Sequence, residues 1–184
     1  MPELTALTVC LWMRTNDTQN KGTPLSYNLQ DGDTEELVLF DYKNFEFIIG
    51  GKGRFCHSRQ TDVSANDGLW HHICVTWDNS DGYWRLYKDG KKAKDGKLEK
   101  GHVIRTGGAL VLGQEQDSFG GSFNAKQCFI GEMTGVNIWD QVKDEEEIQR
   151  MSKSCSIGLG NVFRWAHFKS HLRGSLKVTP LPTC

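Results

Sequence analysis

Apolar and polar residues alternate along much of this chain, and this alternation limits what the chain can fold into. The stretch LTVCLWMR, residues 7–14, shows it most clearly. One set of alternate positions is Leu7, Val9, Leu11 and Met13, and the other is Thr8, Cys10, Trp12 and Arg14. Alternate side chains of a β-strand lie on the same face of a sheet. The stretch therefore predicts a strand with one apolar face directed into a core.

Six further stretches predict strands, and short turn signals separate them. They are residues 36–42, 45–51, 69–78, 83–90, 108–113 and 128–140. Within LWHHICVTWD, residues 69–78, Ile73, Val75 and Trp77 are expected to share one face. Asp81-Gly82 and Asp89-Gly90 are dipeptides typical of hairpin turns. Short strands at this spacing predict a single all-β domain over residues 1–184, folded as a sandwich or a barrel.

One short helix is expected to interrupt the strands near residues 144–152. Asp144 and Glu147 have the spacing of a capping box, and Ile148 and Met151 form an apolar stripe. Acidic residues in the first turn also suit the positive end of the helix dipole.

Length and charge exclude several classes of protein. The 184 residues suit one domain, and 22 basic against 23 acidic side chains give a net charge of −1. That balance predicts neither bulk nucleic-acid binding nor attraction to an acidic membrane. No apolar run reaches the roughly 20 residues of a transmembrane helix. The first residues also lack the basic region followed by an apolar segment that a signal peptide has.

Six widely spaced cysteines indicate an oxidising compartment. They are Cys10, Cys56, Cys74, Cys128, Cys155 and Cys184. None forms the close C-x-x-C pair that zinc knuckles and thioredoxin-type motifs need. An even number at wide spacing is typical of structural disulfides in extracellular proteins. The sequon Asn16-Asp17-Thr18 makes Asn16 a candidate glycosylation site, which agrees with secretion.

The loop GQEQDSFGGSFNAKQ, residues 113–127, concentrates side-chain oxygens. Glu115 and Asp117 are two positions apart, so they would face the same side of an extended chain. Asn124 and Gln127 add two further oxygens a few residues later. Calcium binds six to eight oxygens of these kinds. The loop is therefore a candidate calcium site, and the alternative is an ordinary solvated acidic loop.

The same acids could instead belong to a glycoside hydrolase, which uses a carboxylate pair on one strand. The position at which a second glutamate is expected after Glu115 and Asp117 falls within Phe119-Gly120-Gly121, which has no acid. The general acid is therefore missing, and no catalytic residue is assigned.

Two other motifs could carry chemistry. His71 and His72 are adjacent on an expected strand, so they point to opposite faces and cannot chelate one ion; one is expected to be packed and the other exposed. Six lysines within residues 88–100 predict solvated hairpins, with heparin or another polyanion as the alternative.

Two segments of the chain resemble the pentraxin family. HICVTW, residues 72–77, matches a His-x-Cys-x-Ser/Thr-Trp signature, although Asn79 stands where the signature ends in Ser or Thr. GQEQDSFGGSF, followed by Gln127 and by GVNIWD at residues 135–140, is similar to the family's most characteristic segment. The similarity runs from Thr5 to about Cys184 and is greatest to neuronal or long pentraxins and to pentraxin modules of multidomain proteins. The family's first strand is expected upstream of this start.

The resemblance implies a secreted two-sheet antiparallel jelly roll that binds two calcium ions side by side on one face. Carried over by position, the ligands are Asp33, Glu35, Glu115, Gln116, Asp117, Asn124 and Gln127. Glu115 and Asp117 would bridge both ions, and Gln116 would provide its backbone carbonyl. Asn124 places a neutral ligand where the outer site has an acid, so the outer site is expected to be the weaker.

The resemblance also implies a ligand pocket beside the ions. In the family's short soluble members, the calcium pair holds a phosphate and an apolar pocket holds choline. Phe40 matches the aromatic residue of that pocket, but Ile48 replaces a small residue and Gly53 stands at the place of an acid. Phosphocholine is therefore not the expected ligand. A protein, a glycan or another anionic ligand is expected instead.

Disulfide pairing follows from the same resemblance. Cys10–Cys74 matches the family's bond between two strands, and Cys155–Cys184 matches the bond that ties down the tail in neuronal pentraxins. Cys56 and Cys128 remain, and they are expected to bond with each other or with another chain.

Together these inferences predict an extracellular, non-catalytic recognition domain whose calcium ions bind an anionic or protein ligand. Assembly into a ring, as in related domains, would multiply weak contacts, whereas modules inside long proteins often stay single. The alternative function is a structural adhesion module whose calcium only stabilises the fold.

Overall fold

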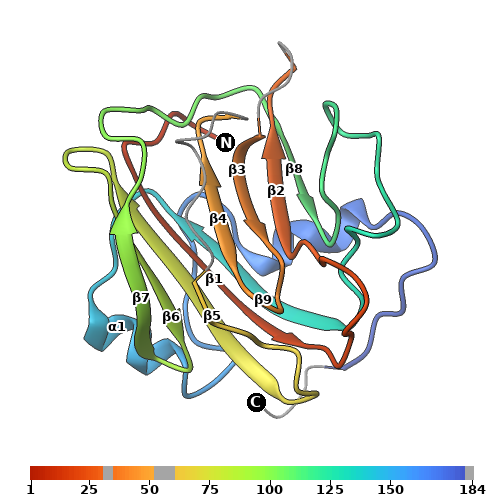
Figure 1. Ribbon diagram of the computed structural model, residues 1–184. Helices are drawn as coiled ribbons and strands as arrows, with labels where there is room; N and C mark the ends of the chain where they lie inside the picture. The colour runs from red at the N-terminus through yellow and green to blue at the C-terminus, as the bar shows by residue number, and fades with distance from the viewer. Residues whose placement is uncertain (31–34, 52–60, 181–184) are drawn as a thin grey trace.

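Two antiparallel sheets form the part of the chain that the computed structural model describes, which is residues 1–30, 35–51 and 61–180 (Figure 1). The first sheet has the order β7-β6-β5-β1-β9, made of β7 (Lys91–Lys97), β6 (Tyr83–Lys88), β5 (Trp70–Asp78), β1 (Ala6–Arg14) and β9 (Glu132–Trp139). The second has the order β4-β3-β2-β8, made of β4 (Glu46–Ile49), β3 (Glu35–Phe40), β2 (Leu25–Asn28) and β8 (Ala109–Leu112). All the strand pairs are antiparallel. The predicted all-β architecture is confirmed, as a two-sheet sandwich.

The hydrophobic core lies between the two sheets. Leu7, Leu11 and Met13 of β1 are fully buried in it, as the alternation predicts. Trp77 of β5 packs into the same cluster, and its indole Nε1 donates to the carbonyl oxygen of Leu98 at 2.9 Å. The buried indole therefore keeps a hydrogen-bond partner while its ring fills the core.

The outer face of the five-stranded sheet is also covered, in this case by helix α1 (Glu145–Met151). Its buried residues Ile148 and Met151 belong to a second apolar cluster. The other members of that cluster are Cys10, Cys74, Tyr87 and Trp139. Thr8, Cys10 and Trp12, which face away from the core, are thus buried too, and alternation along the strand could not show this.

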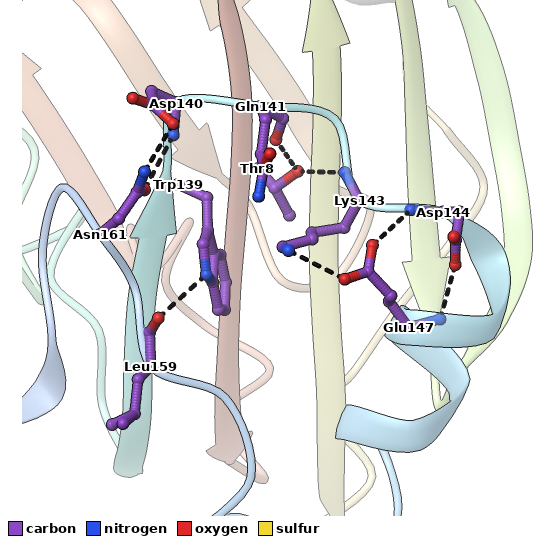
Figure 2. Close-up of polar contacts among 9 residues, drawn as sticks. All are labelled: Thr8, Trp139, Asp140, Gln141, Lys143, Asp144, Glu147, Leu159 and Asn161. Atoms are coloured by element: carbon purple, nitrogen blue, oxygen red, sulfur yellow. Dashed lines mark hydrogen bonds and ion pairs between the residues drawn. The ribbon is translucent and has the colours of Figure 1, made fainter.

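Helix α1 begins with the capping box that the sequence predicts. Asp144 Oδ1 accepts the backbone N–H of Glu147 at 2.8 Å, and Glu147 Oε2 accepts the backbone N–H of Asp144 at 3.3 Å (Figure 2). The helix ends one residue earlier than the predicted span, because Ser152 is its C-cap.

The hairpin between β6 and β7 confirms the predicted turn at Asp89-Gly90. Both residues have positive φ angles, 52° and 77°, which is the geometry of a two-residue type I′ turn. The lysines beyond the turn form the edge strand β7 rather than loops alone. A charged edge strand discourages pairing with another sheet.

Three elements were not predicted. They are the short strand β2, the edge strand β7 and the 3-10 helix η1 (Trp165–His171). None carries an amphipathic pattern long enough to be recognised from sequence. Within the ranges that the structure describes, no helix has the length and apolarity needed to cross a bilayer.

Both histidines of β5 are buried, so the expectation that one is exposed was wrong. His71 Nδ1 lies 2.7 Å from Asp89 Oδ2, and its Nε2 lies 3.0 Å from Asp67 Oδ1, so carboxylates meet both ring nitrogens. The ring of His72 lies 5.2 Å from that of Trp12. Burial lowers the pKa of His72 to about 4, against a smaller opposing effect of Asp89.

Candidate metal-binding site

The oxygen-rich loop lies across the outer face of the four-stranded sheet. After β8, the backbone N–H of Gly113 donates to the carbonyl oxygen of Pro24 at 3.0 Å. The hydroxyl of Ser26 then donates to the carbonyl oxygen of Gln114 at 2.7 Å, and the side-chain amide of Asn28 donates to that of Gln116. Outward-facing side chains of β2 therefore fix the path of residues 113–116.

The side chain of Gln116 anchors the loop from within. It is fully buried, and its Nε2 donates to the carbonyl oxygens of Ser26 and Ala109 at 3.1 and 3.0 Å. Its Oε1 accepts the backbone N–H of Gly120 at 2.8 Å, which draws the far side of the loop inward. The backbone carbonyl of Gln116 is the predicted calcium ligand. A carbonyl oxygen has two lone pairs, so accepting from Asn28 leaves one available.

Glu115 and Gln127 are twelve positions apart in sequence and meet in the structure. Glu115 is only 3 % exposed, and its Oε2 accepts a hydrogen bond from Gln127 Nε2 at 3.0 Å. Gln127 is placed by pairing of its segment with residues 21–23, because its carbonyl oxygen accepts the backbone N–H of Thr23 at 3.0 Å. A carboxylate at this depth favours a compensating cation.

Asp117 and Asn124 lie at the exposed side of the loop. Asp117 directly follows the buried Gln116. Asn124 Oδ1 accepts the backbone N–H of Lys126 at 3.0 Å, and its backbone carbonyl accepts that of Gln127 at 2.9 Å. The Asn124 amide oxygen thus accepts one hydrogen bond within its own turn, and as a neutral ligand it attracts an outer ion less than a carboxylate would.

Glu35 begins β3 directly opposite Asn28 of β2, next to a register shift between Tyr27 and Asn28. Residues directly opposite in an antiparallel pair lie on one face of the sheet. Since Asn28 reaches Gln116, Glu35 lies on the same side as the loop. Asp33, the other predicted ligand of this region, lies outside the described residues.

Sequence reasoning missed Asn28. Its side chain is 2 % exposed, and its Oδ1 has no hydrogen-bond partner among the residues that the structure describes. A buried amide oxygen beside the Gln116 carbonyl is the kind of atom that a hard cation satisfies. Glu115, Glu35 and Gln127 add further oxygen ligands of the types that calcium prefers, so the donor set fits calcium. No pattern in LSYN marks this asparagine, because its role depends on the pairing of β2 and on the loop above it.

The predicted pocket residues lie on the outer face of the same sheet. Ile48 is 4 % exposed and packs against Val38, with Phe40 partly buried at their side. Lys21 Nζ lies 5.7 Å from the centre of the Phe40 ring. Gly53 lies outside the described residues. The space around Ile48 is therefore filled by side chains of the chain itself, and Lys21 places a cation of the chain over the Phe40 ring.

The cysteines confirm one predicted disulfide and correct another. Cys10 and Cys74 are bonded, between neighbouring positions of β1 and β5. Cys155 is disulfide-bonded, and its predicted partner Cys184 lies outside the described residues. Cys128 is a free thiol that donates to the carbonyl oxygen of Ala125 at 3.0 Å, so the predicted bond to Cys56, a residue outside the described ranges, is not formed.

One group of potential ligands lies elsewhere in the fold. Cys10, His72 and Cys74 bring a ring nitrogen and two sulfurs together. Because both sulfurs belong to the disulfide, this buried group is not a metal site.

Comparison with known proteins identifies the fold and the family. A family model described as the Pentaxin family matches residues 1–180. The chain belongs to the pentraxin family. Human neuronal pentraxin-2 is 40% identical over all of this chain and 42% of that protein. A mouse protein named for its sushi, von Willebrand factor type A, EGF and pentraxin domains is 39% identical over 97% of this chain and 5% of that protein.

Among solved structures, a heptameric SAP-like pentraxin from Limulus polyphemus matches with a TM-score of 0.75 and 24% identity, over 90% of this chain and 78% of that one. The jelly-roll form of the sandwich is thereby confirmed. The chain spans less than half the length of the relatives it matches in sequence. It is a pentraxin domain of the kind found in neuronal pentraxins and in a multidomain protein, which is consistent with a recognition or interaction module.

Proposed function

We propose that this pentraxin domain is an extracellular, non-catalytic recognition module that binds an anionic ligand through calcium. The observation that carries the proposal is the buried carboxylate of Glu115, held between the Gln127 amide and the anchored Gln116. These residues, with Asn28, Glu35 and the more exposed Asp117, would hold the ion. Bound calcium supplies positive charge with coordination positions that an anionic group can complete.

Several features support this proposal over a solvated acidic loop. A solvated loop has no need of a fully buried glutamine that makes four hydrogen bonds inside it. It also has no need to bury the Glu115 carboxylate beside the Gln127 amide. The Cys10–Cys74 disulfide agrees with an oxidising, extracellular setting. Asn16 is exposed and stays a candidate glycosylation site there.

The chemistry beside the site favours an anionic ligand over a cationic one. Lys21 already lies over the Phe40 ring, and Ile48 is packed against Val38. A quaternary ammonium group would meet a like charge and occupied space at this place. A protein or glycan that carries a carboxylate, sulfate or phosphate meets neither obstacle. The heptameric Limulus structure supports the further proposal that assembly multiplies such contacts.

Calorimetric titration of calcium into the chelator-stripped protein tests the proposal. The expected result is two binding events, the second weaker because Asn124 is neutral where an acid would attract the ion more strongly. The isosteric variant Glu115→Gln, Asp117→Asn is expected to lose both. The matched control Glu145→Gln, Glu146→Gln makes the same charge change on exposed residues of α1 and is expected to keep both.

The outcomes separate recognition from a purely structural ion. Absence of any heat of binding would contradict the calcium mechanism. If a single event is found, and binding to an anionic glycan survives chelation of the folded domain, calcium only stabilises the fold and the adhesion-module alternative holds.

A further inference from the structure

A groove of about 420 Å³ lies on the outer side of the five-stranded sheet, between α1 and the segment of residues 153–159 that follows it. Trp139 of β9 and Met151 of α1 line it, and Ile157 and Leu159 line it from the segment. Its volume is within the range of ligand-binding sites. The candidate calcium loop covers the other sheet, so the groove is a separate site. Figure 1 shows α1 and the loop after β8 at opposite sides of the sandwich.

The walls of the groove are held by specific contacts. Trp139 Nε1 donates to the carbonyl oxygen of Leu159 at 3.1 Å, which fixes the segment to the end of β9 (Figure 2). Asn161 and Asp140 exchange hydrogen bonds of 2.6 and 3.2 Å just beyond. Cys155 anchors the start of the segment through its disulfide. A groove with fixed walls loses little conformational entropy when it is filled.

Gly158 keeps the groove open. A Cβ atom at this position would lie 3.0 Å from Met151 Sδ and 3.4 Å from the ring of Trp139. Its φ angle of 100° also favours glycine. A side chain at residue 158 would therefore press against Met151 and Trp139 and narrow the groove.

Two large apolar side chains border the groove and are exposed to solvent. Ile157 is 47 % exposed and Leu159 is 70 % exposed. A single exposed aliphatic side chain is normal on a protein surface. Here two of them lie on one wall of one groove, beside an indole that is itself nearly buried. Contact with a partner would remove their apolar surface from water, which is favourable.

The charges around the groove are unbalanced. Lys143 Nζ is paired with Glu147 Oε1 at 2.9 Å and lies 6.0 Å from the centre of the Trp139 ring (Figure 2). Arg150 and Lys153 also line the groove and are exposed. Within the described ranges, neither has an ion-pair or side-chain hydrogen-bond partner. The uncompensated charge of the groove is therefore positive.

We propose that this groove binds a peptide segment of a partner protein in which an acidic side chain lies next to a large apolar one. The carboxylate would pair with Arg150 and Lys153, and the apolar side chain would pack on Trp139, Ile157 and Leu159. A simple anion would leave the two aliphatic side chains exposed. A purely apolar segment would desolvate the cations without pairing them. This binding needs no calcium and goes beyond the proposed function of the loop site.

Nuclear magnetic resonance of the ¹⁵N-labelled protein tests the proposal with short synthetic peptides in EDTA. The probe is the peptide Gly-Glu-Leu-Phe-Glu-Gly. Three controls accompany it: a peptide with lysine in place of glutamate, a peptide with alanine in place of leucine and phenylalanine, and sodium acetate. The expected result is a shift of the Trp139 indole N–H signal and of the amides of residues 150–159 with the first peptide only. The indole signal is assigned with Trp139→Phe.

Variants of the exposed residues locate the binding. Arg150→Ala with Lys153→Ala is expected to weaken binding about tenfold, as is Leu159→Ser. Lys169→Ala with Arg173→Ala removes the same charges elsewhere on the surface and is expected to change nothing. Shifts that persist in both groove variants, equal shifts with the lysine peptide or with acetate, or no shift at all would overturn the proposal.

Discussion

At the scale of single residues, the burial of His72 makes the unfolding free energy of the protein depend on pH. Its pKa in the folded protein is about 4, below the ordinary value of 6.5, mainly because the ring is buried. The unfolded state therefore binds more protons once the pH falls below 6.5. Stability is fully present above that pH and decreases down to about pH 4, by about 3 kcal/mol in total.

His72→Gln is expected to remove this part of the pH dependence. Urea unfolding between pH 7.5 and 4.5 checks it, by comparing the slope of the unfolding free energy for the wild type with that of the variant. His171→Gln, at an exposed histidine, is the control and is expected to follow the wild type. Parallel curves for wild type and His72→Gln would show that His72 is not responsible.

Sequence alone could predict the site residues whose type marks them as ligands, but not those whose role depends on their neighbours in the fold. Glu115, Gln116 and Gln127 stand out in an oxygen-rich loop, and the structure brings them together. Asn28 stands in an unremarkable stretch, and its contact with Gln116 exists only because β2 pairs with β8 beneath the loop. The burial of His71 likewise depends on Asp67 and Asp89, which reach it from separate turns.

At the scale of elements, strands with an alternating or continuous apolar pattern were predictable, even the four-residue β4 and β8, whereas β2 and β7 were not. β1 and β5 alternate over nine residues each. β2 has four residues and is buried on both faces, since Leu25 and Tyr27 enter the core while Ser26 and Asn28 lie under the loop. η1 carries no helical pattern and depends on ring contacts such as those of Phe168 with Phe163 and Trp165.

Helix α1 has only seven residues, so its stability must come from its cap and from packing. Asp144→Ala removes the hydrogen bond to Glu147 and is expected to lower the unfolding free energy by about 1 kcal/mol. Ile148→Ala opens a cavity over the Cys10–Cys74 disulfide and is expected to lower it by roughly 3 kcal/mol. Urea unfolding measures both. Asp144→Ser, which keeps a capping oxygen, serves as the control and should lose little; equal losses for all three would contradict this division.

At the scale of the whole molecule, the two candidate sites lie on opposite outer faces of one sandwich. The loop site rests on Ser26 and Asn28 of the four-stranded sheet, whereas the groove rests on Trp139 and Met151 over the five-stranded sheet. The close-packed core between the sheets separates them, and no residue belongs to both. Sites without shared contacts usually contribute independently to stability.

Calcium is therefore expected to stabilise the groove variant Arg150→Ala, Lys153→Ala as much as the wild type. A ligand that binds only the folded state, present at a hundred times its Kd, adds about 2.7 kcal/mol to the unfolding free energy. Thermal unfolding with and without calcium measures this gain, which should vanish in Glu115→Gln, Asp117→Asn alone. A groove variant that lost the calcium response would show that the two faces are coupled.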